Sequence, residues 1–196
     1  MLENAIEFRT AVYASLGIQK SPEQTVQPEE GVVNVTVIVR NTTRRIANLK
    51  ELKRGLRGLG DSFSPRARIA FVIAQMETLS FREQVEVMAH TSILVSAHGA
   101  GLVGAYFMPA GGIVAEMYTE GFLPCDFGDN MRAAGHTYVH WCMSQHKQYP
   151  ETGCSPSEAG VNGAYPDGDV YFDESLIPLL VEAISKSVAD GARQRR

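Results

Sequence analysis

An apolar strand that runs directly into a histidine and two glycines restricts the fold of this chain more than any other feature. Residues 94–97 read Leu-Val-Ser-Ala, residues 98–101 read His-Gly-Ala-Gly, and Leu102 begins a further apolar stretch. A strand, a tight glycine turn and the start of a helix direct backbone N–H groups toward one point. This order is typical of anion sites in α/β proteins.

Strand and helix patterns alternate along the chain. The β-branched run at 32–39 suits a central parallel strand that is buried on both faces. Further strands are predicted at 68–73, 93–97, 113–117, 137–142 and 169–172. Helices are predicted at 2–16, 49–59, 81–89, 123–134 and 176–188. The alternation predicts an α/β layered domain with a mainly parallel sheet.

Two four-residue stretches match the capping box, in which the first and fourth residues satisfy backbone N–H groups reciprocally. They are Asn48-Leu-Lys-Glu51 and Ser80-Phe-Arg-Glu83. The second box opens a helix whose spacing predicts four inward-facing side chains. These are Phe81, Val85, Met88 and Ala89.

Length and composition favour one domain that spans residues 1–192. The chain has 196 residues, of which 44% are hydrophobic. We expect a loop or linker at 19–31, a surface excursion at 144–167 and a frayed tail at 193–196. A net charge of −4 argues against nucleic-acid binding. Apolar runs fall short of the roughly 18–20 residues of a spanning helix, and the acidic start leads us to expect no targeting segment.

Several common site motifs are missing or incomplete. The three cysteines, Cys125, Cys142 and Cys154, lack metal-ligand spacing, so they are interpreted as structural or as one disulfide with an odd thiol. Residues 99–104 match Gly-x-Gly-x-x-Gly in form, but the preceding histidine is unlike a dinucleotide loop. Neither a Walker A motif nor a Gly-x-Ser-x-Gly elbow is present, so a hydrolase would lack its nucleophile.

Charged residues follow several predicted strands. Arginines at 40–45 follow the first strand, Glu77 the second and His98 the third, and Glu116 lies near the end of the fourth. Because the carboxyl ends of parallel strands share one edge of a sheet, we expect these residues along that edge. Arginines beside helix N–H groups suit a diphosphate, and a carboxylate suits ribose hydroxyls.

Each of these residues also has a simpler interpretation. Gly99 and Gly101 can serve a tight turn alone, and His98 can be a histidine that hydrogen-bonds to backbone. The arginines can form a solvated loop, and Glu116 can cap a loop. The sequence leaves these alternatives open.

Three stretches taken together resemble the family 61 glycosyltransferases. They are residues 77–84 (Glu-Thr-Leu-Ser-Phe-Arg-Glu-Gln), 96–102 (Ser-Ala-His-Gly-Ala-Gly-Leu) and 107–117 (Phe-Met-Pro-Ala-Gly-Gly-Ile-Val-Ala-Glu-Met). Upstream, the strand that ends at Arg40 and the helix entry at Asn48 fit the same pattern. The resemblance spans roughly residues 1–142, and its specificity lies in the combined order of the motifs.

The resemblance implies a Rossmann-like, mainly parallel sheet with helices on both faces, which forms one half of a GT-B arrangement. This half would bind a nucleotide sugar, commonly a UDP-sugar, and the acceptor-side half would be missing. The enzyme would be an inverting, metal-independent hexosyl- or pentosyltransferase that acts on a glycan or protein-linked acceptor, without a cofactor. Arginines and helix N–H groups would stabilise the departing diphosphate.

The resemblance also assigns residues to the donor nucleotide. They are Arg40, Arg44, Arg45, Glu77, His98, Gly99, Ala100, Gly101, Leu102 and Glu116. His98 is in addition a candidate catalytic residue. No general base is assigned, because in such a cleft it can come from the other half.

Two other functions remain alternatives: a truncated module that binds nucleotide without transferring a sugar, and an unrelated small α/β hydrolase. The compartment is not set by the sequence. The Golgi or endoplasmic reticulum lumen would fit a eukaryotic family member that is part of a longer protein, and the cytoplasm would fit otherwise.

Overall fold

The computed structural model describes residues 2–20, 32–59, 68–118, 127–142 and 168–194. Within them, a five-stranded sheet has the order β2-β1-β3-β4-β5, and every neighbouring pair is parallel. The strands are β1 (Val32–Ile38), β2 (Arg68–Ala74), β3 (Ile93–Ala97), β4 (Ile113–Tyr118) and β5 (Thr137–Cys142). The predicted parallel α/β sheet is therefore confirmed.

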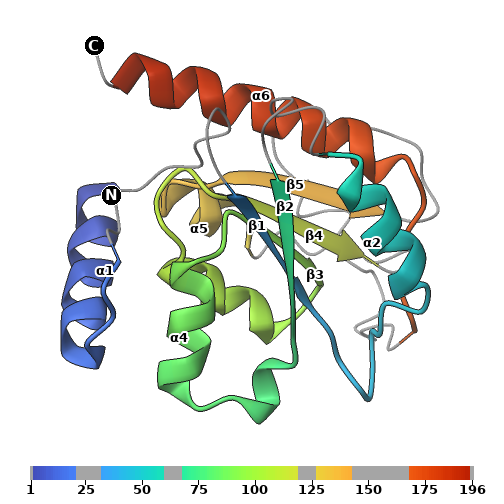
Figure 1. The fold of residues 1–196 in the computed structure, drawn as a ribbon, viewed down its shortest axis with the longest axis horizontal. Helices are drawn as coiled ribbons and strands as arrows, with labels where there is room; N and C mark the ends of the chain where they lie inside the picture. Colours follow the sequence, from blue (N-terminus) through green and yellow to red (C-terminus); the bar gives the residue numbers. More distant parts are fainter. Residues whose placement is uncertain (1, 21–31, 60–67, 119–126, 143–167, 195–196) are drawn as a thin grey trace.

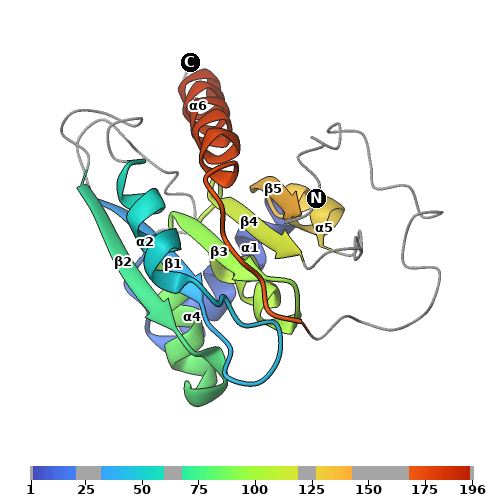
Figure 2. The same ribbon diagram turned by 90° about the vertical axis from the view of Figure 1, so that its right-hand side faces the viewer.

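Helices cover both faces of the sheet (Figures 1 and 2). The α-helices are α1 (Leu2–Leu16), α2 (Leu49–Arg57), α4 (Phe81–Ala89), α5 (Gly128–Ala133) and α6 (Leu176–Gln194). Two 3₁₀ segments, η1 (Met76–Thr78) and η2 (Ala100–Phe107), follow β2 and β3. Helices α2 and α6 pack on one face, whereas α4, η2 and α5 pack on the other, with α1 outside them.

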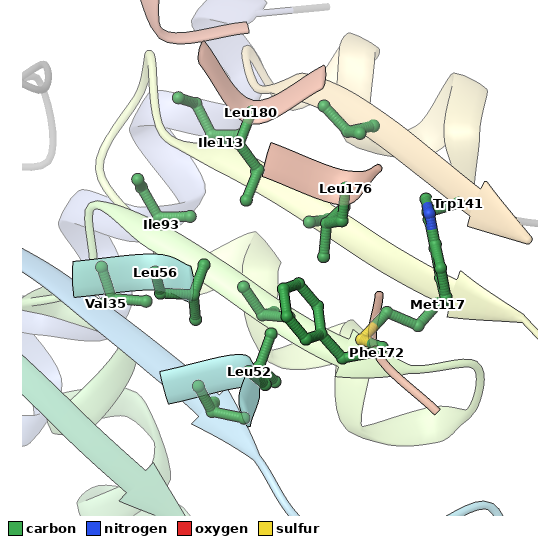
Figure 3. Packing of buried hydrophobic residues seen from close by; sticks show 14 of the residues in the cluster. Val35, Leu52, Leu56, Ile93, Ile113, Met117, Trp141, Phe172, Leu176 and Leu180 are labelled. Atoms are coloured by element: carbon green, nitrogen blue, oxygen red, sulfur yellow. The ribbon is translucent and has the colours of Figure 1, made fainter. Parts of the chain in front are cut away.

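The face under α2 and α6 carries the larger buried cluster (Figure 3). Side chains of β1, β3 and β4 alternate toward it, and Phe172 lies between α2 and α6. A β-carbon on Gly55, inside α2, would approach the Phe172 ring to 2.6 Å. The glycine therefore lowers helix propensity but admits the aromatic ring that joins the two helices.

Asn48 does not cap α2 with its side chain, so this part of the capping prediction is wrong. Its amide instead donates to the carbonyl of Phe172 and accepts from the Phe172 N–H, both at 2.7 Å. Two backbone groups that would otherwise be unpaired near the core are satisfied in this way. Ser80 and Glu83, by contrast, form the predicted capping box of α4.

The opposite face contains Leu94 and Val114 beneath Met88, Leu102 and Met108. The spacing of α4 predicts that Phe81 also faces this core, but Phe81 is 57% exposed, so that prediction is wrong. It lies in the first turn of α4, and its ring meets Phe107 edge-on at 5.6 Å instead.

Helix α1 is attached to this face by a buried arginine. Arg9 donates to the backbone carbonyls of Tyr106 and Ala134, and it approaches His136 to 3.3 Å. Burial lowers the pKa of Arg9 and, together with the charge of Arg9, lowers the pKa of His136 to about 3. His136 is therefore neutral at physiological pH.

The remaining predictions concern short segments of the chain. Val170 forms an isolated parallel bridge with Ile46 rather than part of a strand, so the strand predicted at 169–172 is wrong. Helix α5 begins at Gly128, while the earlier part of the predicted 123–134 helix lies outside the described residues. The same holds for the excursion at 144–167, most of the linker at 19–31, Cys125 and Cys154. Helix α6 continues to Gln194, into the stretch predicted as a tail.

Candidate functional site

The order of the strands places two loops at a topological switch point. From β1 the chain crosses to β2 on one side, whereas β3 and β4 lie on the other side. In open parallel sheets, ligands bind where neighbouring strands lead away in opposite directions, beyond their carboxyl ends. Arg40 follows β1 and His98 follows β3, so these two residues lie at that point.

Gly99 is the residue at which the two loops meet. Its φ of 146° and ψ of −179° belong to a region that is essentially restricted to glycine. A β-carbon there would overlap Nη1 of Arg40 and lie 3.6 Å from Nη1 of Arg44. Two guanidinium groups therefore converge on the backbone at the start of η2.

Arg44 shows signs of a constrained position. Its φ of 53° is in the left-handed region, which is uncommon for a residue other than glycine. Its Nη1 donates to the carbonyl oxygen of His98 at 3.1 Å. Its buried Nε has no hydrogen-bond partner among the described residues. The strained backbone and the unpaired buried donor mark Arg44 as a residue held in place by its surroundings.

His98 and Glu116 form a buried pair beside this loop. Glu116 is fully buried and His98 is 6% exposed, and Nδ1 of His98 lies 2.5 Å from Oε1 of Glu116. The backbone N–H of His98 also donates to the carbonyl of Met117 at 2.9 Å, which extends the contact between β3 and β4. A buried carboxylate is stable only when neighbouring groups donate hydrogen bonds to it.

Two tyrosines also lie beside Glu116. The Tyr138 hydroxyl donates to Oε2 of Glu116, and the Tyr118 hydroxyl lies 2.8 Å from that of Tyr138. Burial, with the nearby charge of Glu116, raises the pKa of both tyrosines. The rings of Tyr118 and Phe127 each lie 5.6 Å from the His98 ring.

The sequence did not single out Tyr118, Tyr138 or Phe127. The alternation of side chains along β5 is a signal that points to Tyr138. Val139 and Trp141 belong to one core cluster, so Tyr138 and His140 occupy the alternate positions of the strand. The register then pairs Glu116 with His140. Burial, followed by the charge of Arg132, lowers the pKa of His140.

Several predicted site residues have other surroundings. Arg45 is 55% exposed and pairs with Asp169 at 2.7 Å. Glu77 is exposed in η1, after the edge strand β2.

A β-carbon on Gly101 would lie 3.4 Å from Ile38, so Gly101 faces the core. Leu102 is fully buried, and its N–H donates to the carbonyl of Gly99 within η2, whereas Ala100 is exposed. Their predicted contacts with a donor nucleotide stay predictions.

Two kinds of feature are absent from the described part of the chain. None of its helices is both long and apolar enough to cross a membrane. No three or more His, Cys, Asp or Glu side chains in the described ranges are grouped so that they could hold a metal ion.

Comparison with known proteins adds a family assignment. The sequence model described as Glycosyltransferase 61 matches residues 3–115. An "EGF domain-specific O-linked N-acetylglucosamine transferase" from Bos taurus is 30% identical over 125 residues, which cover 63% of this chain and 22% of that protein. The same-named protein from Gallus gallus is 29% identical over 157 residues, which cover 80% and 28%.

A second kind of relative is a "Protein O-linked-mannose beta-1,4-N-acetylglucosaminyltransferase 2" from Takifugu rubripes. It is 38% identical over 84 residues, which cover 43% of this chain and 13% of that protein. The chain thus spans less than a third of the length of each of these relatives.

Proposed function

The chain belongs to the glycosyltransferase 61 family, and on that premise we propose that it binds the nucleotide-sugar donor of a glycosyltransferase at the His98–Gly101 turn. The observation that carries this proposal is the convergence of Arg40 and Arg44 on Gly99. Two fixed cations at a strand-to-helix turn suit the diphosphate of a nucleotide sugar. The position at the switch point of a parallel sheet supports the same ligand.

The same groups suit the chemistry of transfer. When the bond between the sugar and the diphosphate breaks, negative charge develops on the departing oxygen, and preorganised donors lower the energy of that state. Arg40 and Arg44 are placed to take this role, and in the proposed reaction no metal ion is needed for it. Transfer proceeds with inversion, and the base that accepts the proton of the attacking hydroxyl is left unassigned.

The names of the relatives extend the proposal to donor and acceptor. Those names specify N-acetylglucosamine transfer and acceptors on proteins or on protein-linked mannose. We therefore propose UDP-N-acetylglucosamine as the first donor to test, with a protein or protein-linked glycan as acceptor. This step rests on the relatives rather than on the geometry of the site.

Calorimetric titration of the chain with UDP and with UMP tests the proposed function. If the arginines hold a diphosphate, UDP binds saturably and about tenfold or more tightly than UMP, because one charged hydrogen-bonding group is lost in UMP. The affinity for UDP should be the same in the presence of EDTA. A chain that binds neither nucleotide, or binds both equally, would refute the diphosphate site.

A further inference from the structure

We propose that Tyr138, supported by Tyr118, is a positioning residue that holds Glu116 against His98 and thereby fixes which ring nitrogen of His98 carries its proton. The inference deepens the proposed function and rests on it for its relevance to the donor. The underlying contacts join three segments that are separate in the sequence: the turn after β3, the second half of β4 and the start of β5.

The direction of each hydrogen bond follows from Glu116. A carboxylate oxygen accepts hydrogen bonds, and we take each neighbour of Glu116 as a donor to it. Tyr138 donates to Oε2, and its oxygen is then the acceptor for the hydroxyl of Tyr118 at 2.8 Å. In the proposed arrangement His98 donates from Nδ1 to Oε1, which lies 2.5 Å away. The chain of hydrogen bonds therefore has one polarity, from Tyr118 through Tyr138 to Glu116, with His98 as the second donor.

Burial supports this polarity. Glu116 has no exposed surface, so water cannot replace a missing donor. The raised pKa of both tyrosines keeps their hydroxyl protons in place, so they act as donors throughout the physiological range. The Tyr138 ring is itself fixed by the guanidinium of Arg132, which lies 5.5 Å from the ring centroid.

The consequence for His98 is chemical. With the proton held at Nδ1, a neutral ring presents Nε2 as an acceptor, and a protonated ring presents it as a donor. Without the carboxylate contact, the neutral ring would exchange between its two tautomers. A carboxylate that fixes the tautomer of a donor-binding histidine also fixes whether its other ring nitrogen donates or accepts a hydrogen bond. Carboxylates that are hydrogen-bonded to metal-bound histidines fix the tautomer in the same way in other proteins.

Side-chain ¹H–¹⁵N correlation spectra of His98 test the inference without any ligand. In the parent chain the Nδ1 signal should be of the protonated type. In Tyr138→Phe it should move toward the averaged position of a ring that exchanges between tautomers, and in Tyr118→Phe it should move in the same direction by less. Tyr13→Phe is the matched control, because it removes a buried hydroxyl that donates to the carbonyl of Phe107, in the packing around α1 rather than beside Glu116.

Titration of the same variants with UDP separates the inference from the function on which it rests. We expect Tyr138→Phe to weaken UDP binding by about 3- to 10-fold, the effect of one neutral hydrogen bond, and Tyr13→Phe to leave it unchanged. An unchanged His98 spectrum in Tyr138→Phe would overturn the positioning role even if UDP binds. A shifted spectrum in a chain that binds no UDP would support the positioning role and refute the proposed function.

Discussion

A β-carbon on Gly99 would occupy the space taken by Nη1 of Arg40. Because Gly99 has no side chain, the guanidinium of Arg40 can lie close to the backbone of the loop that follows β3. Because Gly99 also has a backbone conformation that other residues rarely adopt, two independent requirements coincide at this position.

Gly99→Ala is accordingly expected to damage both fold and site. The strained backbone should cost about 1–3 kcal/mol of unfolding free energy, and displacement of Arg40 should weaken UDP binding by about tenfold or more. Gly168→Ala is the control, because a β-carbon there would meet no atom within 4 Å and Gly168 lies outside the proposed site. Thermal unfolding and calorimetry on both variants measure the two effects. Equal UDP affinity in the two variants would contradict the role of Gly99.

The three arginines of the first loop should differ from one another. Arg40→Ala and Arg44→Ala should each weaken UDP binding by about 1.5–3 kcal/mol, the usual contribution of a charged hydrogen bond. Arg45→Ala should change it by less than about 0.5 kcal/mol, since Arg45 is exposed and paired with Asp169. Calorimetry at fixed ionic strength makes the comparison. A loss in Arg45→Ala as large as in the other two would indicate a diffuse electrostatic effect instead of a site.

Asn48 allows a test of a structural role against a capping role. Its amide both donates to and accepts from Phe172. Asn48→Ala should therefore lower the unfolding free energy by about 1–3 kcal/mol, and Asn48→Asp should also be destabilising because the donor is lost. A helix cap would tolerate aspartate as well as asparagine. Urea unfolding of both variants decides the matter, and a neutral Asn48→Asp would favour the cap.

His136 should make stability depend on pH. The folded chain keeps the ring neutral down to about pH 3, whereas the unfolded chain takes up a proton near pH 6.5. The contribution of His136 to the free energy of unfolding is therefore fully present above about pH 6.5. It is lost as the pH falls toward 3, by up to about 1.4 kcal/mol per pH unit.

The measurement is urea unfolding at several pH values between about 7 and 4, a range that lies mostly below the ordinary pKa of histidine. His136→Gln should be less stable at neutral pH but should lose stability less steeply as the solution is acidified. Parallel curves for the parent and His136→Gln would contradict the buried neutral histidine.

The sheet could be predicted because its signals are local. The β-branched run of β1 and the apolar runs of β3 and β4 are typical of buried parallel strands. The carboxyl ends of these strands then lie along one edge of the sheet. The placement of Arg40 and His98 beyond neighbouring strands followed from that edge. Phe81 was misplaced because helical spacing does not tell whether the first turn extends beyond the sheet.

The partners of Asn48, Arg45 and Glu116 could not be predicted, because each contact depends on long-range register. Asn48 and Arg45 contact residues 124 positions later in the chain, after a long stretch without clear patterns. Tyr138 meets Glu116 only because β4 and β5 pair in the observed register. The different roles of Gly99 and Gly101 likewise depend on which side of each backbone faces Arg40 or Ile38.

The position of Phe172 has a consequence for synthesis on the ribosome. Residues from Val170 to Ile184 supply the last part of the cover over β1, β3 and β4, and they emerge after all five strands. Until they do, the space beside Gly55 on α2 that Phe172 fills is empty, and the apolar side of the sheet stays partly open to water. A nascent chain that ends before this segment therefore leaves part of the apolar face of the sheet uncovered, and the cover over β1, β3 and β4 is complete only after α6 has emerged.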